Sequence, residues 1–180
     1  MKKILQAAFL ILLIIIFIFT QTGCGKKVEK KSYEILIKNT EQMTIVYLEH
    51  TGSYEQMEPL FGQLGGYAAQ KGITGNLVGI FYDDPSVIRA ESLRSEIGFV
   101  IPDGFMPDSG YGIQTIPARK VVYAILKGPY DKIAGEYDYI KEWIAKKGYK
   151  MNGAVTEIYL EGGPNIPPEQ YVTEVQFPIE

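Results

Sequence analysis

An internal repeat constrains the fold of this chain more than any other feature of its sequence. When the 180 residues are compared with themselves at an offset of 76, Gly52-Ser53-Tyr54 aligns with Gly128-Pro129-Tyr130, and Lys71-Gly72 aligns with Lys147-Gly148. With two further residues in the second copy, the aligned residues become Glu96, Phe99 and Ile101 with Glu174, Phe177 and Ile179. A period of this length is too long for a solenoid repeat. The sequence therefore predicts a duplicated module with pseudo-twofold symmetry.

Each copy shows the same order of patterns. Segments rich in β-branched and aromatic residues predict strands, and a Gly-containing turn followed by a segment that ends in Lys-Gly predicts a helix. The expected strands are 43–48, 75–82 and 96–101 in the first copy, and 120–126, 154–160 and 172–177 in the second. The predicted fold is α+β, a duplicated β-α-β-β module with copies at about 33–102 and 113–180 and a linker at 102–112.

The two predicted helices differ in quality. In the second copy, hydrophobic residues recur at helical spacing, at Ile133, Tyr137, Ile140 and Ile144. The first helix keeps such a stripe, but one proline and three glycines interrupt it, at Pro59, Gly62, Gly65 and Gly66. Since these residues disfavour helix interiors, we expect the first helix to start late or to kink.

The first 24 residues predict membrane targeting. Lys2 and Lys3 precede an apolar run at 4–19, and Cys24, the only cysteine of the chain, follows shortly after this run. The order of a basic start, an apolar run and small residues is typical of a secretory signal. At 16 residues, the run is short for a full membrane span.

This beginning resembles a bacterial lipoprotein signal. The resemblance implies that residues 1–24 are a signal peptide and anchor lipidated at Cys24, with 25–32 as a tether. The alternative is an uncleaved signal anchor, with Cys24 as a juxtamembrane thiol. In both cases we expect the domain at 33–180 to be held at a cell membrane on its extracytoplasmic side.

Composition excludes several kinds of site. The chain has 18 Lys and Arg against 21 Asp and Glu, a net charge of −3, so we expect no nucleic-acid partner. With one His and one Cys, a Cys/His zinc site and an intrachain disulfide are excluded, and we predict no metal and no cofactor. We interpret His50 as a turn residue and Asp83-Asp84-Pro85 as a turn, not a cation site.

Three phrases, in their order and spacing, resemble the GyrI-like domain, the effector-binding domain attached to many AraC-type and multidrug-responsive regulators. They are the segment 43–54, Glu157-Ile158-Tyr159-Leu160 followed by Pro164, and the segment 171–179. The resemblance covers 33–180. It implies two β-α-β-β units that face each other across a ligand cleft, which holds apolar, aromatic and often cationic small molecules.

Glu157 is the first candidate site residue. By strand alternation Glu157 and Tyr159 share one face, and a carboxylate among apolar neighbours needs a partner such as a ligand cation. The resemblance makes Glu157 the acid of the pocket. A solvent-facing glutamate on an edge strand is the alternative. The first copy has Gly79 at the aligned position, so the predicted pocket is asymmetric.

Aromatic residues are the other candidates. The resemblance implies that Tyr54 and Tyr171 line the pocket, where their rings would offer flat apolar contact and attract cations. Tyr130, the repeat partner of Tyr54, is a weaker candidate, and Trp143 could cap the cleft. For each of them, ordinary core packing is the alternative.

Two functions from different classes remain open. The first is a membrane-tethered binding protein for apolar and aromatic molecules, cations among them, without a DNA-binding domain ahead of residue 33. The second is a hydrolase, since some GyrI-like proteins open cyclopropane-containing compounds with water; Glu157 would then act as general acid or base. A domain without a ligand, used only as an interaction surface, is a third possibility. The sequence predicts no oligomeric state.

Overall fold

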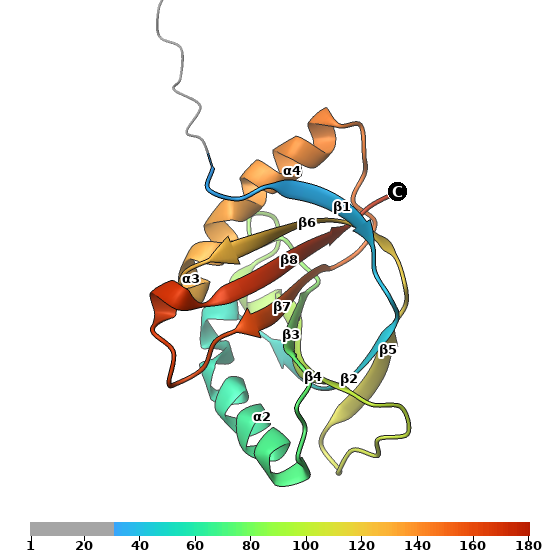
Figure 1. Ribbon diagram of the computed structural model, residues 1–180, viewed down its shortest axis with the longest axis vertical. Helices are drawn as coiled ribbons and strands as arrows, with labels where there is room; N and C mark the ends of the chain where they lie inside the picture. The colour runs from blue at the N-terminus through green and yellow to red at the C-terminus, as the bar shows by residue number, and fades with distance from the viewer. Residues whose placement is uncertain (1–30) are drawn as a thin grey trace, which may run out of the picture. The chain divides into compact units, whose positions relative to one another are not determined.

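The computed structural model describes residues 31–180, which fold around one eight-stranded antiparallel sheet (Figure 1). Its strands are β1 (Ile35–Asn39), β2 (Met43–Thr51), β3 (Leu77–Phe81), β4 (Arg94–Ile101), β5 (Gly112–Ile116), β6 (Lys120–Lys127), β7 (Val155–Glu161) and β8 (Val172–Pro178). Their order in the sheet is β1-β6-β8-β7-β3-β4-β2-β5. The mixed α and β fold and the six expected strands are confirmed, with slightly different ends.

The first helix starts late, as expected, but it is the more continuous of the two. It begins with a short 3-10 turn at Tyr54–Met57 and continues as α2 (Glu58–Lys71). The second helix divides into α3 (Tyr130–Ile133), a 3-10 turn (Ala134–Glu136) and α4 (Tyr137–Lys146). Pro59 lies in the first turn of α2, where its missing N–H is not needed. The buried residues Leu64, Tyr67 and Ala68 hold the rest of α2 against the sheet, so tertiary packing outweighs the glycines.

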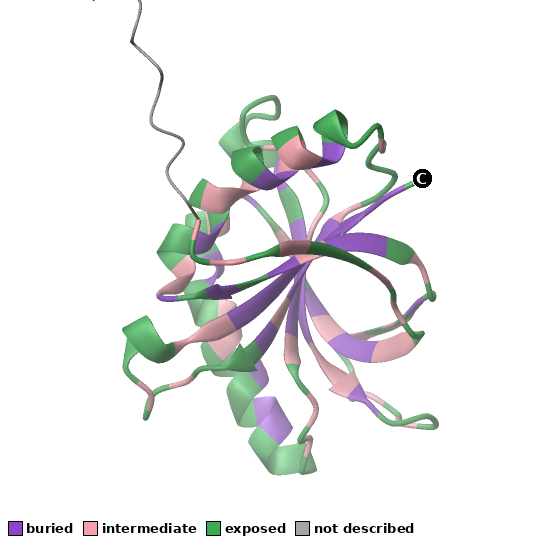
Figure 2. Cartoon of the chain, turned by 45° about the horizontal axis from the view of Figure 1, so that its top comes forward, coloured by how far each residue is buried: buried purple, intermediate pink, exposed green. Residues whose placement is uncertain are grey.

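Both long helices cover the same face of the sheet. α2 contributes Leu64 to a cluster with Leu48 of β2 and Ile97 of β4. α4 contributes Ile140 and Ile144 to a second cluster over β6, β7 and β8. Leu48 and Ile97 belong to a cross-strand row that continues into β7 and β8, so the two clusters lie on one face. Buried residues accordingly concentrate in the central strands (Figure 2).

The edge strands β1 and β5 did not enter the predicted module. β1 lies ahead of the first strand expected in the copy at 33–102 but pairs with β6 of the other copy. β5 lies ahead of the first strand expected in the copy at 113–180 but pairs with β2. The segments that follow β1 and β5 meet where the Thr40 N–H donates to the Arg119 carbonyl oxygen at 2.8 Å. The linker expected at 102–112 ends at Gly112, the first residue of β5.

Residues 1–30 lie outside the described residues, so the signal, the lipidated Cys24 and most of the tether stay predictions. Within 31–180, none of the helices has the length and apolar character needed to cross a membrane.

Candidate functional site

Glu157 lies near the middle of an otherwise apolar row on the helix-covered face. The row crosses seven strands through directly opposed residues, in the order Leu48, Ile97, Gly79, Glu157, Val175, Ala124 and Ile35. Glu157 is the only polar side chain among these seven and is only 6% exposed. The alternative of a solvent-facing glutamate on an edge strand is therefore wrong, because β7 is a central strand between β3 and β8.

Two tyrosine hydroxyls hold the Glu157 carboxylate. Tyr137, the first residue of α4, donates to Oε1 at 2.6 Å, and Tyr159 donates to Oε2 at 2.7 Å. The contact with Tyr159 confirms that the two β7 residues share a face. Glu157 forms no ion pair with any residue in the described part of the chain. Within 31–180, its negative charge is thus met by neutral donors and by no cation.

The electrostatics of this group follow from burial. Burial raises the pKa of Glu157 above its ordinary value of 4.5, while the two tyrosine hydrogen bonds act in the opposite direction. Burial, followed by the charge of Glu157, raises the pKa of Tyr137 and of Tyr159 well above 10. Both hydroxyls therefore stay protonated donors, and Glu157 is the group in this trio that changes charge.

Gly79 gives the row its asymmetry. It faces Glu157 across the β3–β7 pair. A Cβ at this position would lie 3.0 Å from the Tyr159 hydroxyl and 3.0 Å from the Phe81 ring. Such a distance is shorter than ordinary van der Waals contact, so the absent side chain makes room for the Tyr159 hydroxyl. Gly79 thus leaves room for the Tyr159 hydroxyl, which donates to Glu157.

Two aromatic rings, one from α3 and one from α2, pack on Tyr159. Tyr130 of α3 meets it edge to face at a centroid distance of 4.9 Å, and Phe61 of α2 does so at 6.2 Å. Tyr171 stacks on Tyr130 at 4.6 Å. Tyr130, the weaker candidate, therefore contacts both Tyr159 and Tyr171. The rings form an aromatic cluster next to the carboxylate.

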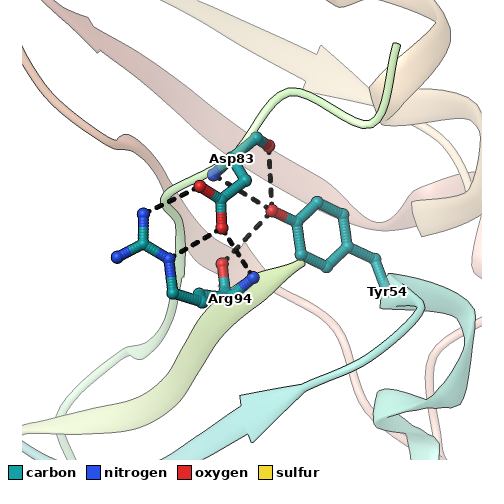
Figure 3. A network of polar contacts seen from close by, with 3 residues as sticks. All are labelled: Tyr54, Asp83 and Arg94. Atoms are coloured by element: carbon teal, nitrogen blue, oxygen red, sulfur yellow. Dashed lines mark hydrogen bonds and ion pairs between the residues drawn. The ribbon is translucent and has the colours of Figure 1, made fainter. Parts of the chain in front are cut away.

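Tyr54 joins this cluster from the first copy. Its ring packs edge to face on Phe81 at 5.0 Å, and both rings border the apolar cluster that contains Tyr159. The Tyr54 hydroxyl donates to the Asp83 carbonyl oxygen at 2.9 Å (Figure 3). Asp83 in turn binds the Arg94 guanidinium through both carboxylate oxygens, at 2.9 and 2.8 Å. The ring is thus fixed at its polar end.

The other singled-out residues lie apart from Glu157. Trp143 packs on the cluster beneath α4, with the Lys147 Nζ 5.4 Å from its ring centroid. The His50 Nε2 lies 3.0 Å from the Ser53 carbonyl oxygen, as a turn residue does. Among residues 31–180 no group of three or more acidic, His or Cys side chains is arranged to hold a metal ion.

A hollow of about 450 Å³ lies at the C-terminal end of α2, bordered by 71–75 and by 100–102 with Phe105. None of the predicted site residues lines it. The cleft at Glu157 stays a prediction, because Tyr137 and Tyr159 occupy the space over the carboxylate.

Tyr137 is the site residue that the sequence did not reveal. Its position in the apolar stripe of the second helix indicated core packing, and its ring does pack on Phe177 at 5.2 Å. Its hydroxyl, however, reaches Glu157. The available signal was chemical: a tyrosine on a buried stripe needs a partner for its hydroxyl.

Two curated proteins are similar to this chain in sequence. A DNA gyrase inhibitor of Serratia proteamaculans (strain 568) is 30% identical over 95 residues, which are 48% of this chain and 59% of that protein. The SPbeta prophage-derived putative transcriptional regulator YosT of Bacillus subtilis (strain 168) is 24% identical over 151 residues, 82% of this chain and 99% of that protein. The chain thus spans about three fifths of the gyrase inhibitor.

Several solved structures share the fold. The EcmrR–DNA complex in EcmrR-RPo matches with a TM-score of 0.73 at 21% identity, over 99% of this chain and 68% of that one. A hydrolase of Listeria innocua matches with a TM-score of 0.59 at 11% identity, over 82% and 92%. SAV2435 bound to tetraphenylphosphonium matches with a TM-score of 0.53 at 14% identity, over 82% and 94%.

These matches correct one expectation. The exclusion of nucleic-acid partners is wrong, because EcmrR, which shares the fold, was solved on DNA, and YosT is named a putative transcriptional regulator. The exclusion rested on the net charge of the whole chain. The net charge of a chain does not determine whether a protein with this fold takes part in a complex with DNA, as EcmrR does.

The resemblance noted in the sequence is borne out at the level of the family. The model of the GyrI-like small molecule binding domain matches residues 33–180, which include every strand and helix described above. The chain belongs to the GyrI-like small molecule binding domain family.

Proposed function

We propose that this domain binds amphipathic aromatic cations next to Glu157. One observation carries the proposal: a carboxylate only 6% exposed lies in an apolar row, and no described cation pairs with it. A buried charge is costly unless an opposite charge compensates it. A ligand cation supplies that charge, and the tyrosine donors hold the carboxylate until the ligand arrives.

The surrounding rings suit such a ligand. Tyr130, Tyr159, Tyr171 and Phe61 offer faces and edges to a flat apolar group, and aromatic faces attract cations. Tyr54 supplies the wall from the first copy. The ligand enters by displacing the Tyr137 hydroxyl or the Tyr159 hydroxyl from Glu157, because both cover the carboxylate in this structure.

The structure of SAV2435 supports the choice of probe. That protein shares the fold and was solved with tetraphenylphosphonium, an apolar aromatic cation. At 14% identity the likeness concerns the fold alone. The proposal for this chain therefore rests on Glu157 and its aromatic neighbours.

We also infer that the site lies on a pseudo-twofold axis between two copies of one module. Exchanging β1, β2, β3 and β4 with β5, β6, β7 and β8 turns the strand order into its own reverse. The registers agree with this exchange, since Val46 opposes Phe99 and Val122 opposes Phe177. Gly79 and Glu157, aligned in the repeat, then oppose each other across the axis.

The proposed function is tested by titrating the protein with tetraphenylphosphonium and comparing Glu157→Gln with Glu161→Gln. Glu161 is an exposed carboxylate on the same strand, so it is a matched control. We expect Glu157→Gln to weaken binding more than about tenfold, which corresponds to ~1.4 kcal/mol. Glu161→Gln should change it less than about twofold. Equal effects of the two variants would contradict the proposal.

A hydrolase is the second candidate function. It is favoured by the raised pKa of Glu157, which suits a general acid or base, and by the hydrolase of Listeria innocua with the same fold. The test is mass spectrometry after incubation with a cyclopropane-containing electrophile. A product heavier by one water that is lost in Glu157→Gln supports catalysis. Unchanged ligand recovered with the protein supports binding alone.

A further inference from the structure

The Asp83-Asp84 dipeptide lies in the loop between β3 and β4 and contacts residues on both sides of the proposed site. Asp83 fixes the first wall. Its carbonyl oxygen accepts from the Tyr54 hydroxyl at 2.9 Å, and its carboxylate binds both the side chain and the backbone N–H of Arg94 (Figure 3). The Asp83 side chain is 11% exposed, whereas the Arg94 side chain is 65% exposed, so solvent reaches this contact from the Arg94 side.

Asp84 holds the second wall. The Lys141 Nζ of α4 lies 2.6 Å from Asp84 Oδ2, and Ser86 donates to Asp84 Oδ1 through its backbone N–H and its hydroxyl. These partners, with Lys141 as the largest cause, lower the pKa of Asp84 to about 2. Asp84 is therefore a full negative charge at neutral pH. It connects the β3–β4 loop of the first copy to α4 of the second.

Lys141 lies one helical turn after Tyr137, and residues four apart stand on the same helix face. The Tyr137 hydroxyl is the donor to Glu157 Oε1. A chain of contacts thus links the two sides of the site. Glu157 contacts Tyr137, α4 carries both Tyr137 and Lys141, and Lys141 pairs with Asp84. The neighbouring Asp83 contacts Tyr54. We name Asp83, Asp84, Arg94 and Lys141 the aspartate latch.

We propose that the aspartate latch controls ligand entry by holding α4, with Tyr137, against the loop that fixes Tyr54. The inference rests on the proposed function, because it concerns access to Glu157. Glu157 and Tyr159 are 6% and 7% exposed. Of the two hydroxyls that cover the carboxylate, the Tyr137 hydroxyl is the one carried by α4, so the latch concerns entry by displacement of Tyr137. Moving α4 breaks the contact between Lys141 and Asp84. The latch residues are positioning residues and do not touch the ligand.

A latch of this kind affects association first. If α4 must separate from the loop before the ligand enters, loss of the ion pair increases the population of the open form. For a partly exposed pair, we expect the association rate constant to rise about two- to fivefold. The dissociation rate constant should stay within about twofold of wild type, since the pair is already broken in the complex.

The test is stopped-flow binding of tetraphenylphosphonium to the whole protein in Lys141→Met, Asp84→Asn and the double variant. The two single variants change the net charge in opposite directions, so general attraction of the cation changes in opposite directions too. The latch predicts that both raise the association rate constant. The double variant, whose net charge equals that of wild type, should match the single variants and not exceed them.

Two further variants complete the design. Lys146→Met removes one positive charge from α4, as Lys141→Met does, but Lys146 pairs with Glu142 within α4. The association rate constant of this variant should therefore change only as its net charge predicts. Lys141→Arg should restore the wild-type rate within about twofold. Rates that follow net charge in every variant would overturn the inference, as would a fall in rate for both single variants.

Hydrogen exchange separates this inference from the proposed function. Without any ligand, Lys141→Met should speed amide exchange in 137–146 about two- to fivefold and leave 58–71 unchanged. If wild type fails to bind tetraphenylphosphonium, the proposed function fails, while exchange still tests the latch. Unchanged exchange in 137–146 would overturn the latch even if the ligand binds at Glu157.

Discussion

The Glu157 carboxylate lowers the stability of the fold at the place where it lies. Its neighbours in the row are apolar, and its two hydrogen bonds come from neutral hydroxyls. Removing a carboxylate from water costs more than neutral donors return. A residue of this kind is typical of binding and catalytic sites, where perturbed pKa values cluster.

Stability should depend on pH through Glu157. The pKa of the folded state is raised above 4.5, so between pH 4.5 and that raised value the folded state holds a proton that the unfolded state has released. Stability from this group is therefore lost as the pH rises through this window. In Glu157→Gln this loss is absent, and the variant should be at least as stable as wild type at pH 7. Urea unfolding across pH 4 to 8 measures it; parallel profiles would refute the assignment.

Gly79→Ala should destabilise the protein by about 1–3 kcal/mol, because the new Cβ meets the Tyr159 hydroxyl and the Phe81 ring at 3.0 Å. Gly62→Ala is the control, since nothing lies within 4 Å of a Cβ there and alanine favours the α2 interior by about 0.5–1 kcal/mol. Chemical unfolding should give opposite signs for the two variants. A neutral effect at Gly79 would show that Tyr159 does not depend on it.

The sequence predicted part of this site. Alternation placed Glu157 and Tyr159 on one face, and the hydrogen bond between their side chains bears this out. The repeat alignment made Gly79 the position equivalent to Glu157, but it did not predict that the two residues oppose each other across β3 and β7. Helical spacing places Tyr137 in the apolar stripe of the second helix, but it does not indicate which group its hydroxyl reaches. The contact arises only when α4 packs on the sheet.

At the scale of elements, local pattern and tertiary packing disagree in the helices. The glycines of α2 weaken its intrinsic preference, yet its buried residues pack on β2 and β4 and hold it in one piece. The second stripe is regular, yet the helix breaks at Ala134–Glu136. Sequence spacing predicts which face is buried, and packing decides how continuous the helix is.

The edge strands could not be inferred from the repeat, because each pairs with the other copy. β1 is held there partly by Lys38, whose Nζ lies 2.6 Å from Oε1 of Glu174 on β8 and 4.5 Å from the centroid of the Tyr123 ring. Neither contact is local in sequence. The periodicity of a sequence predicts local elements, and it does not predict contacts between residues so far apart in the chain.

Lys38→Met should destabilise the protein by about 1–3 kcal/mol, because it leaves the buried Glu174 without its cation. Lys38→Arg should retain most of the stability. Guanidinium unfolding measures both, and hydrogen exchange should show faster opening of β1 in the methionine variant. If Lys38→Met and Lys38→Arg are equally stable, β1 does not depend on this pair.

At the scale of the molecule, the two halves contribute unequally to one site. The second half supplies Glu157, Tyr137 and Tyr159, and the first supplies Gly79, Tyr54 and the aspartates of the latch. The sequence repeat therefore does not extend to Glu157, the acid of the candidate site. Glu157 supplies a charge from the second half, and the residue opposite it in the first half, Gly79, has no side chain.

The attachment of this domain to a membrane is a separate prediction. Mass spectrometry of the membrane fraction should show a diacylated or triacylated N-terminus at Cys24, since the apolar run that leads to it resembles a lipoprotein signal. Cys24→Ser should shift the protein out of the lipidated fraction. An intact Met1 in the membrane fraction would instead support an uncleaved anchor.

Recognition of ligand charge by Glu157 is the central claim, and four dissociation constants test it most directly. They are those of tetraphenylphosphonium and of neutral triphenylphosphine oxide, each measured by calorimetry with wild type and with Glu157→Gln. The account predicts that the variant weakens the cation more than about tenfold, or ~1.4 kcal/mol, and leaves the neutral compound within about twofold. Equal losses for both compounds would mean that Glu157 supports the fold and not the charge, and no loss for either would place it outside the binding site.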